Sequence, residues 1–356
     1  MIPLGNEVAH ALAMAQTLGR QGNKALELSF WEKAISLNPN IPHTHLRRGG
    51  LKLDSCEYDE AEREFTRAIE LRPRFQEAYC SLGVSKSRRG RLEEAIRDYD
   101  KGLKAMPRGG NGLFHRGAER DGAILFSNKA GAYDKLGDYN AAIRESGAAA
   151  SLDPEYAGSY INRAHARLHL GQHLEMDGAL ENCDKAIELD KSSGEAYAVR
   201  AVVKAVSKEY DSVDVMVDAC KAVELEPENP DVHYLRGLAL AETGDDEEAI
   251  ASFSRVLESM PNHAESFLNR ANARQRLGGL SEASPDFKEA LRCFDRFLED
   301  NPSSARGCLG RAQSNAGLGL KADARRDFER VRDIWLNLTP QDNVNAGKVE
   351  AVLATL

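Results

Sequence analysis

A short phrase of alternating apolar and polar residues recurs along the chain. It runs Lys or Arg, Ala, Ile or Val, a polar residue and Leu, and it stands at residues 33–39, 67–73, 185–190 and 221–227. Three of these copies end in Pro, and Pro39, Pro73 and Pro107 follow one another at intervals of 34 residues. A fixed period of this length indicates that one structural unit is repeated along the chain.

Small residues stand at fixed places inside each repeat. In the third repeat the pattern is carried by Tyr79, Leu82, Gly83, Gly90, Ala95, Tyr99 and Pro107. Small side chains allow two antiparallel helices to approach closely, an aromatic ring fills the gap between them, and Gly and Pro end helices. Each repeat is therefore predicted to be a pair of helices joined by a tight turn.

The order of these residues resembles the tetratricopeptide repeat, W-x2-L-G-x2-Y…A-x3-F…P with a period of about 34 residues. Nine repeats are recognised, and they begin near Val8, Pro42, Gln76, Ala123, Ala157, Gly194, Pro230, Ala264 and Ala305. The resemblance implies an all-α fold. It would be a right-handed superhelical solenoid of about nine helix-turn-helix units, closed by a C-terminal capping helix.

Departures from the period divide the chain into four segments. Residues 1–107 hold repeats one to three, and residues 108–122 form a Gly-rich insertion between repeats. Residues 123–331 hold repeats four to eight and most of the ninth, and residues 332–356 form an extension with a capping helix. Because stacked repeats bury their faces against neighbours, we expect a terminal cap and contacts between adjacent repeats alone.

The charge of the chain is concentrated in its middle. The net charge is −9, and residues 157–261 carry 10 Lys+Arg against 21 Asp+Glu. General nucleic-acid binding needs a basic stripe, so this distribution excludes that class of function.

The composition also predicts where the protein works. No apolar run approaches the roughly 18–20 residues that span a bilayer, and no secretory signal is visible at the N-terminus. The six cysteines are scattered without a Cys-x-x-Cys, which is typical of small buried side chains in a reducing compartment. We therefore expect a cytoplasmic protein with no membrane partner.

If the resemblance holds, the first helix of each repeat lines the concave face of the superhelix. The groove residues expected in repeats four to eight are Asn128, Asp134, Lys135, Asn162, His165, His169, Glu195, Val199, Val202, Val206, Asp231, Tyr234, Leu238, Glu242, Glu265, Asn269, Asn272 and Gln275. This list predicts an apolar strip with carboxylates at its edges. A ligand suited to such a groove is a basic segment with apolar side chains.

Some members of this family hold the acidic tails of heat-shock chaperones in a two-carboxylate clamp. The two asparagines of that clamp have counterparts in Asn128 and Asn162. The positions that need Lys or Arg hold Ile124, Glu195 and Val199 instead. An acidic tail would meet like charge here, so a heat-shock chaperone tail is not expected as the partner.

Arginine and acidic residues alternate between the two helices of most repeats. The arginines are Arg48, Arg163, Arg200, Arg236, Arg270 and Arg311, and the acids are Glu64, Asp98, Glu145, Asp218, Asp286 and Asp327. They could form a ladder of cations for an acidic ligand, or Arg–carboxylate pairs that bridge packed helices. We favour the second interpretation.

Three histidines, His165, His169 and His173, are spaced four residues apart, and imidazoles at this spacing can chelate a transition metal. Gly171 is expected to end the helix before His173, and no further ligand is placed with certainty. We therefore expect polar groove residues and no metal or other cofactor.

The glycine-rich stretch at residues 108–117 lacks the Lys-Ser/Thr ending of a phosphate-binding loop, and no hydrolase or protease signature occurs. The sequence names no catalytic residue and favours a binding protein over an enzyme. The conclusion is a scaffold or adaptor that binds a protein or peptide in its groove. The alternative is an enzyme or a small-ligand or metal-binding protein on the same frame, with its site near His165, His169 and the insertion at 108–122.

Overall fold

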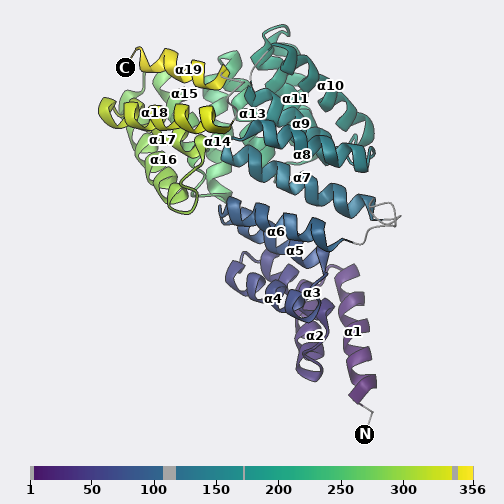
Figure 1. Ribbon diagram of the computed structural model, residues 1–356. Coiled ribbons are helices and arrows are strands. Elements are labelled where there is room, and N and C mark those ends of the chain that lie inside the picture. Colours follow the sequence, from purple (N-terminus) through teal and green to yellow (C-terminus); the bar gives the residue numbers. More distant parts are fainter. Residues whose placement is uncertain (1–3, 107–117, 171–172, 339–343, 356) are drawn as a thin grey trace. The chain divides into compact units, whose positions relative to one another are not determined.

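The computed structural model describes residues 4–106, 118–170, 173–338 and 344–355 (Figure 1). Within these ranges the regular secondary structure consists of nineteen α-helices and no strand. The helices are α1 (Leu4–Arg20), α2 (Lys24–Leu37), α3 (Pro42–Asp54), α4 (Tyr58–Leu71), α5 (Gln76–Arg88), α6 (Leu92–Ala105), α7 (Glu119–Leu136), α8 (Tyr139–Leu152), α9 (Ala157–Leu170), α10 (His173–Leu189), α11 (Gly194–Ser207), α12 (Ser212–Leu225), α13 (Pro230–Thr243), α14 (Asp246–Ser259), α15 (Ala264–Arg276), α16 (Leu280–Asp300), α17 (Ala305–Gly317), α18 (Lys321–Leu338) and α19 (Val344–Leu353).

The predicted all-α array of helix pairs is confirmed. The first helix of seven repeats begins at the residue that the sequence indicated, while α1 and α7 begin earlier, at Leu4 and Glu119. The expected capping helix α19 is present, and α16 is extended to 21 residues. In the part of the chain that the structure describes, no helix is both long and apolar enough to cross a bilayer.

Close packing within each pair depends on the predicted small residues. A Cβ atom added to Gly83 would overlap the ring of Tyr99, and one added to Gly237 would lie 2.6 Å from Cε1 of Phe253. Tyr99 and Phe253 are 1% and 0% exposed, so neither ring has free space into which it could retreat. The glycines therefore set the distance between the two helices.

The favoured reading of the arginines is confirmed in several repeats. Arg200 donates two hydrogen bonds to Asp218, from Nε at 2.8 Å and from Nη2 at 2.7 Å. Arg270 binds Asp286 and Arg311 binds Asp327 through the same two nitrogens. These pairs join the two helices of one repeat. Their guanidinium groups therefore bind carboxylates within the repeat and do not form a ladder of free cations.

The chain divides into two compact units, residues 1–132 and 133–356. We call them the N-terminal array and the C-terminal array. The boundary falls inside α7. Residues 108–117 of the insertion predicted at residues 108–122 lie outside the described residues. Each array is described by itself below.

The N-terminal array is built from contacts between neighbouring repeats. Lys24 Nζ binds Asp54 Oδ2 at 2.7 Å, and Arg89 Nη1 binds Asp59 Oδ1 at 2.6 Å. Its core consists of local clusters, of which one contains Leu53, Ala61, Phe65 and Leu82. This is the nearest-neighbour arrangement expected of a repeat stack.

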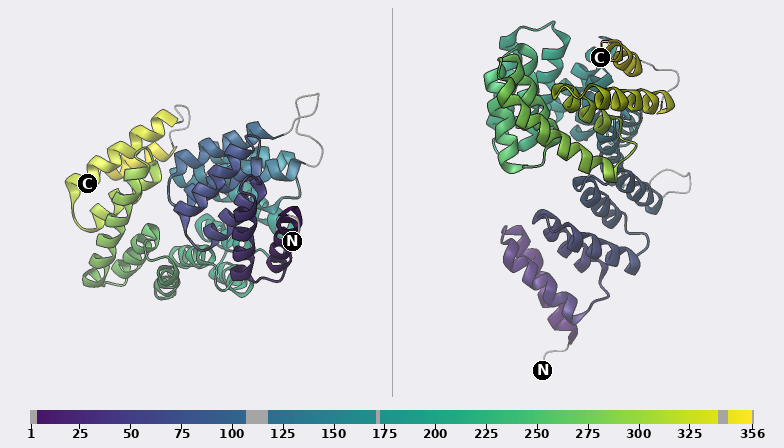
Figure 2. Two further views of the ribbon diagram at one scale, coloured as in Figure 1. Left: turned by 90° about the horizontal axis from the view of Figure 1, so that it is seen from below. Right: turned by 90° about the vertical axis from the view of Figure 1, so that its left-hand side faces the viewer.

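In the C-terminal array the last repeats contact the first, and residues of α8, α17 and α18 share one core cluster. Figures 1 and 2 show the course of the chain through this array. Ser304 Oγ, at the start of α17, donates a hydrogen bond of 3.3 Å to the carbonyl oxygen of Leu136. Trp335 Nε1 donates one of 3.1 Å to Gly137 O, 198 residues away in sequence. The array therefore closes on itself.

Apolar side chains bury this closure. One cluster unites residues of α8 and α9 with residues of α16 to α19: Tyr139, Leu170, Leu298, Ala305, Cys308, Ala312, Ala324, Phe328, Val331, Trp335, Ala346 and Val349. Lys348 of the cap donates to Leu170 O at 3.3 Å. The expectation that repeats contact only their neighbours is wrong for this array, because the small rotation added by each repeat brings the sixth repeat back to the first.

The turn after α7 is shaped for the closure. Gly137 has φ +88°, a left-handed conformation that favours glycine, and a Cβ atom there would lie 3.0 Å from the backbone nitrogen of Arg306. A side chain at position 137 would thus be strained and would also push α17 away from α7.

Candidate functional site in the C-terminal array

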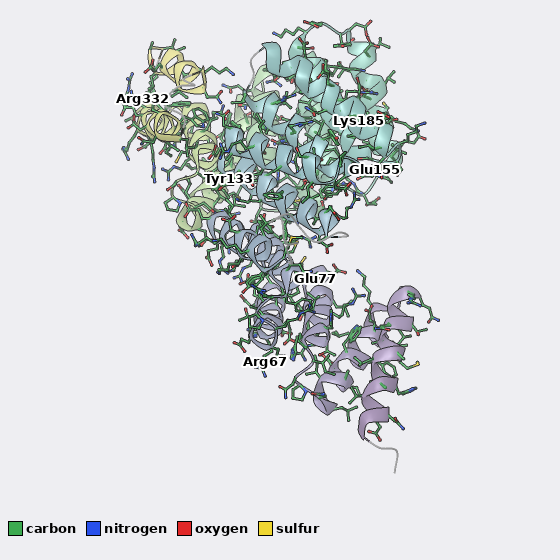
Figure 3. All side chains as sticks on the ribbon, turned by 45° about the vertical axis from the view of Figure 1, so that its right-hand side comes forward. Arg67, Glu77, Tyr133, Glu155, Lys185 and Arg332 are labelled. Carbon is green, nitrogen blue, oxygen red and sulfur yellow. The ribbon has the colours of Figure 1, made fainter. Side chains whose placement is uncertain are left out.

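One network of polar side chains connects the first helices of the repeats in the C-terminal array. Its members are joined by direct contacts or, for Glu195 and Asp231, by electrostatic interaction alone. They are Asp134 of α7, His165 and His169 of α9, Glu195 of α11, Asp231 and Tyr234 of α13, His263 and Glu265 at the start of α15, and Arg306 of α17. We call it the interior network. Figure 3 shows the side chains on the ribbon, with Tyr133 at the start of this array and Arg332 on α18.

Arg306 links the two ends of the network. Its Nη1 lies 3.2 Å from Asp134 Oδ2, and its Nε lies 3.4 Å from Glu265 Oε1. On the far side of Glu265, Oε2 lies 3.9 Å from His263 Nε2. The guanidinium therefore joins a carboxylate of the first repeat in this array to one of the fifth.

Tyr234 continues the network toward α15. Its ring centroid lies 5.0 Å from that of His263 in an edge-to-face arrangement, and its hydroxyl accepts a hydrogen bond of 3.4 Å from Asn269 Nδ2. His263 Nδ1 accepts the backbone N–H of Ser266 and so caps the N-terminus of α15. These contacts fix the position of the Tyr234 hydroxyl and of the Tyr234 ring.

Asp134 and two histidines form the other end. His165 Nδ1 lies 3.3 Å from Asp134 Oδ2, and the rings of His165 and His169 are 4.8 Å apart. The His169 ring also stacks on Tyr139, with centroids 5.0 Å apart. The ligand atoms of Asp134, His165 and His169 all lie within 4.8 Å of one another.

Burial and charge shift the pKa values in this part of the network. Burial lowers the pKa of His169 to about 3, so its imidazole is neutral at neutral pH. Burial alone would raise the pKa of Asp134, but the facing histidines and Arg306 outweigh it and hold that pKa well below its usual range. Because His169 is neutral at neutral pH, the positive charge that stays beside Asp134 at that pH is the guanidinium of Arg306. It also lowers the pKa of Glu265 against the effect of burial.

Glu195 has no ion-pair partner among the described residues. Burial raises the pKa of its carboxyl group, and the charge of Asp231 raises it further. The charges of His165 and Lys135 lower this pKa without outweighing burial. Neither side chain forms an ion pair or hydrogen bond with the residues that the structure describes. Each of these two carboxylates is thus available to a positive charge from outside the chain.

The structure assigns the predicted groove residues to different surroundings. Val199 and Val202 are 0% and 3% exposed and belong to the core between helices, so the predicted apolar strip is wrong at these two positions. That core includes residues of α9 to α13. Leu238 also packs against this core but is only partly buried.

Asp134 is buried, and several other predicted residues keep some exposure. Asp231 and Glu242 are exposed, while Asn162, Tyr234, Asn269 and Asn272 are partly buried. Asn128 belongs to the N-terminal array, where its Nδ2 lies 3.4 Å from Cys80 Sγ. The side chain of His173 lies outside the described residues. Seven predicted residues thus belong to the interior network: Asp134, His165, His169, Glu195, Asp231, Tyr234 and Glu265. Asn269 contacts it through the hydroxyl of Tyr234.

Sequence reasoning missed Arg306, His263 and Tyr139. A signal for Arg306 was present, because the second residue of the first helix is Glu195, Asp231 and Glu265 in repeats six to eight and Arg306 in repeat nine. Extending this register to the last repeat would have placed Arg306 on the same face. Tyr139 begins a second helix and enters the network only through its contact with His169.

Comparisons with known proteins agree with this fold. The sequence profile described as tetratricopeptide repeat matches residues 46–109, 221–264 and 268–335, and a second profile of the same description matches residues 125–156. The crystal structure of the APC/C hetero-tetramer Cut9-Hcn1 superposes with a TM-score of 0.51 at 14% identity, over 91% of this chain and 58% of that one.

Curated relatives match parts of the chain. The small glutamine-rich tetratricopeptide repeat-containing protein 2 of Mycosarcoma maydis is 33% identical over 103 residues, which are 27% of this chain and 29% of the relative. Stress-induced-phosphoprotein 1 of Caenorhabditis elegans is 31% identical over 170 residues, 48% of each chain. The mitochondrial import receptor subunit TOM70 of Homo sapiens is 22% identical over 237 residues, 63% of this chain and 36% of the relative.

These matches span less than half the length of each of the three relatives. The profile matches nevertheless cover more than half of this chain. The chain belongs to the tetratricopeptide repeat family.

Proposed function

We propose that the chain is a protein-interaction scaffold whose C-terminal array binds a basic segment of a partner protein. The family supports the general role, because tetratricopeptide repeats are protein-interaction modules. The observation that carries the finer proposal is the pair Glu195 and Asp231. Their carboxylates lack an ion-pair partner in the described part of the chain, and the raised pKa of Glu195 indicates an unfavourable negative site.

A lysine or arginine of the partner would relieve this unfavourable charge. The ligand cation would supply the opposite charge that Arg306 supplies to Asp134 and Glu265 elsewhere in the network. The excess of acidic residues between 157 and 261 adds a long-range field that attracts a basic ligand.

The apolar part of the ligand has fewer contacts than the sequence suggested. Val199 and Val202 of α11 are buried in the core and cannot contact a ligand. The apolar surface left for a ligand is that of Tyr234 and Leu238 on α13, both partly buried. We therefore expect charge to contribute more of the specificity, and apolar burial less of the affinity, than a groove with a continuous apolar strip would give.

Fluorescence anisotropy with labelled short peptides tests the proposal directly. A peptide that alternates Lys with Leu is expected to bind the full chain and to lose affinity as salt rises, since exposed charges interact over only about 8–10 Å at physiological ionic strength. Reversing Glu195 and Asp231 to Lys should weaken binding by about tenfold or more, because like charges facing each other cost several kcal/mol. Neutral Glu195→Gln with Asp231→Asn should have a smaller effect.

The matched control changes the same net charge at other sites of the C-terminal array. Glu224 and Glu247 are exposed acids of the second helices α12 and α14. Reversing both to Lys should leave peptide binding within about twofold if the contact is local. Equal losses in the two double variants, binding that does not respond to salt, or equal binding of a Glu-Leu peptide would contradict the proposal.

A further inference from the structure

The first helices of the first two repeats in the C-terminal array bring three metal-ligating side chains together. His165 and His169 lie one turn apart on α9, and Asp134 reaches them from the C-terminal end of α7. One ligand atom from each residue lies within 4.8 Å of the other two, and His165 Nδ1 is 3.3 Å from Asp134 Oδ2. The sequence predicted the two histidines as candidate ligands without a third, and the fold places Asp134 beside them as the third ligand.

Two atoms of this cluster are buried without a hydrogen-bond partner. They are Asp134 Oδ1 and His169 Nε2. A buried polar atom that bonds to nothing costs about 1–3 kcal/mol, and such atoms are rare in folded proteins. Two of them in one cluster of ligand-type side chains indicate that a further group binds there.

The remaining oxygen of Asp134 is already fixed. Arg306 Nη1 lies 3.2 Å from Oδ2, which leaves Oδ1 as the oxygen without a partner. A hydrogen-bond donor on the second oxygen is the usual device that orients a metal-binding carboxylate. Glu265 lies on the other side of the guanidinium and offsets its charge, so the surroundings tolerate a bound cation.

We propose that Asp134, His165 and His169 bind one divalent first-row transition-metal ion, for which zinc is the best match. Two imidazoles and a carboxylate are borderline ligands of the kind that zinc takes at about 2.0–2.2 Å. Tetrahedral bonds of that length put ligand atoms about 3.3–3.6 Å apart, so the cluster contracts slightly when it binds the ion. The fourth position stays open to water or to a side chain of a partner.

The experiment uses the full chain after dialysis against a chelator. Equilibrium dialysis with Zn²⁺ followed by elemental analysis should give one zinc per chain. His165→Gln and His169→Gln should each weaken binding by about 100-fold or more, since even the loss of an outer-shell partner costs 10–100-fold. His233→Gln is the matched control, because His233 belongs to the same array and its Nε2 contacts Pro227 O at 2.7 Å, apart from the cluster.

X-ray absorption at the zinc edge provides a readout that needs no variant. It should show nitrogen and oxygen neighbours with the signature of two imidazoles, and no sulfur. A sulfur shell would instead assign the ion to exposed thiols such as Cys56 or Cys220 and would overturn the proposal. Substoichiometric zinc in the unaltered chain, or equal affinity in His169→Gln and His233→Gln, would overturn it as well.

Discussion

The two arrays follow the same repeat pattern but reach different tertiary structures. In the N-terminal array, Trp31 donates its hydrogen bond within its own helix, to Glu27 Oε1 at 3.0 Å. In the C-terminal array, Trp335 donates to a carbonyl 198 residues away. The comparison teaches that the residues of the repeat pattern build helix pairs, whereas residues outside the pattern decide whether a stack stays open or closes.

The two tryptophans offer the largest test of this comparison. They are 2% and 8% exposed, so replacing either with alanine should cost about 3–5 kcal/mol of stability. The helices that lose stability should differ between the two variants. Trp31→Ala should loosen α1 to α3 alone, whereas Trp335→Ala should also loosen α8, which is distant in sequence.

Hydrogen exchange followed by mass spectrometry measures this difference in the full chain. Faster exchange in residues 139–152 of the Trp335→Ala variant, with unchanged exchange there in Trp31→Ala, is the expected result. If Trp335→Ala affected only α17 to α19, the closure would contribute nothing to the stability of the first repeats, and the contrast between the arrays would fail.

Glycines inside the helix pairs should behave alike in both arrays. Gly83→Ala and Gly237→Ala both place a Cβ against a buried ring, and overpacking of this kind typically costs about 1–3 kcal/mol. Gly147→Ala is the control, since a Cβ there meets nothing within 4 Å and alanine favours a helix by up to about 1 kcal/mol. Thermal denaturation measures all three, and a destabilised Gly147→Ala would show that the control or the packing argument is wrong.

The smallest expected effect concerns the pH dependence of the C-terminal array. Burial lowers the pKa of His263, and the groups facing it are Glu265, Asp231, Lys135, Arg306 and the Tyr234 ring. The unfolded chain takes up this proton near pH 6.5 while the folded chain resists it, so stability is present above that pH and is lost as the pH falls.

His263→Asn keeps an N-cap acceptor for α15 and removes the titration. The variant should therefore lose less stability than the unaltered chain between pH 7 and pH 6, by less than about 1 kcal/mol. Urea unfolding at the two pH values measures the difference. An unchanged pH dependence would mean that His263 titrates equally in the folded and unfolded chain.

Much of the fold could be predicted because the repeat pattern is local. Gly83 and Tyr99 predict a closely packed helix pair, and the structure has one. Pro230 predicts the start of a helix, and α13 begins there. The same register put His165 and Glu195 on the first helices, where the interior network has them. Local pattern was sufficient wherever the physical cause of a feature lay within one repeat.

The closure and the burial of Val199 could not be predicted in this way. Closure depends on the rotation summed over six repeats, and a small difference in each rotation decides whether Arg306 meets Asp134. Val199 stands at a groove position of the repeat pattern, but the core formed by α9 to α13 buries it. Both outcomes depend on angles between helices, which no single residue encodes.

The contact of Ser304 and Trp335 with the turn at Leu136–Gly137 has a consequence for how such a chain can change its length. An open stack can gain or lose one repeat of about 34 residues and keep every remaining interface. In the C-terminal array the same event would rotate the last helices past their docking site and break the hydrogen bond from Trp335 to Gly137 O. Its number of repeats is therefore locked, while the N-terminal array is free to grow or shrink one repeat at a time.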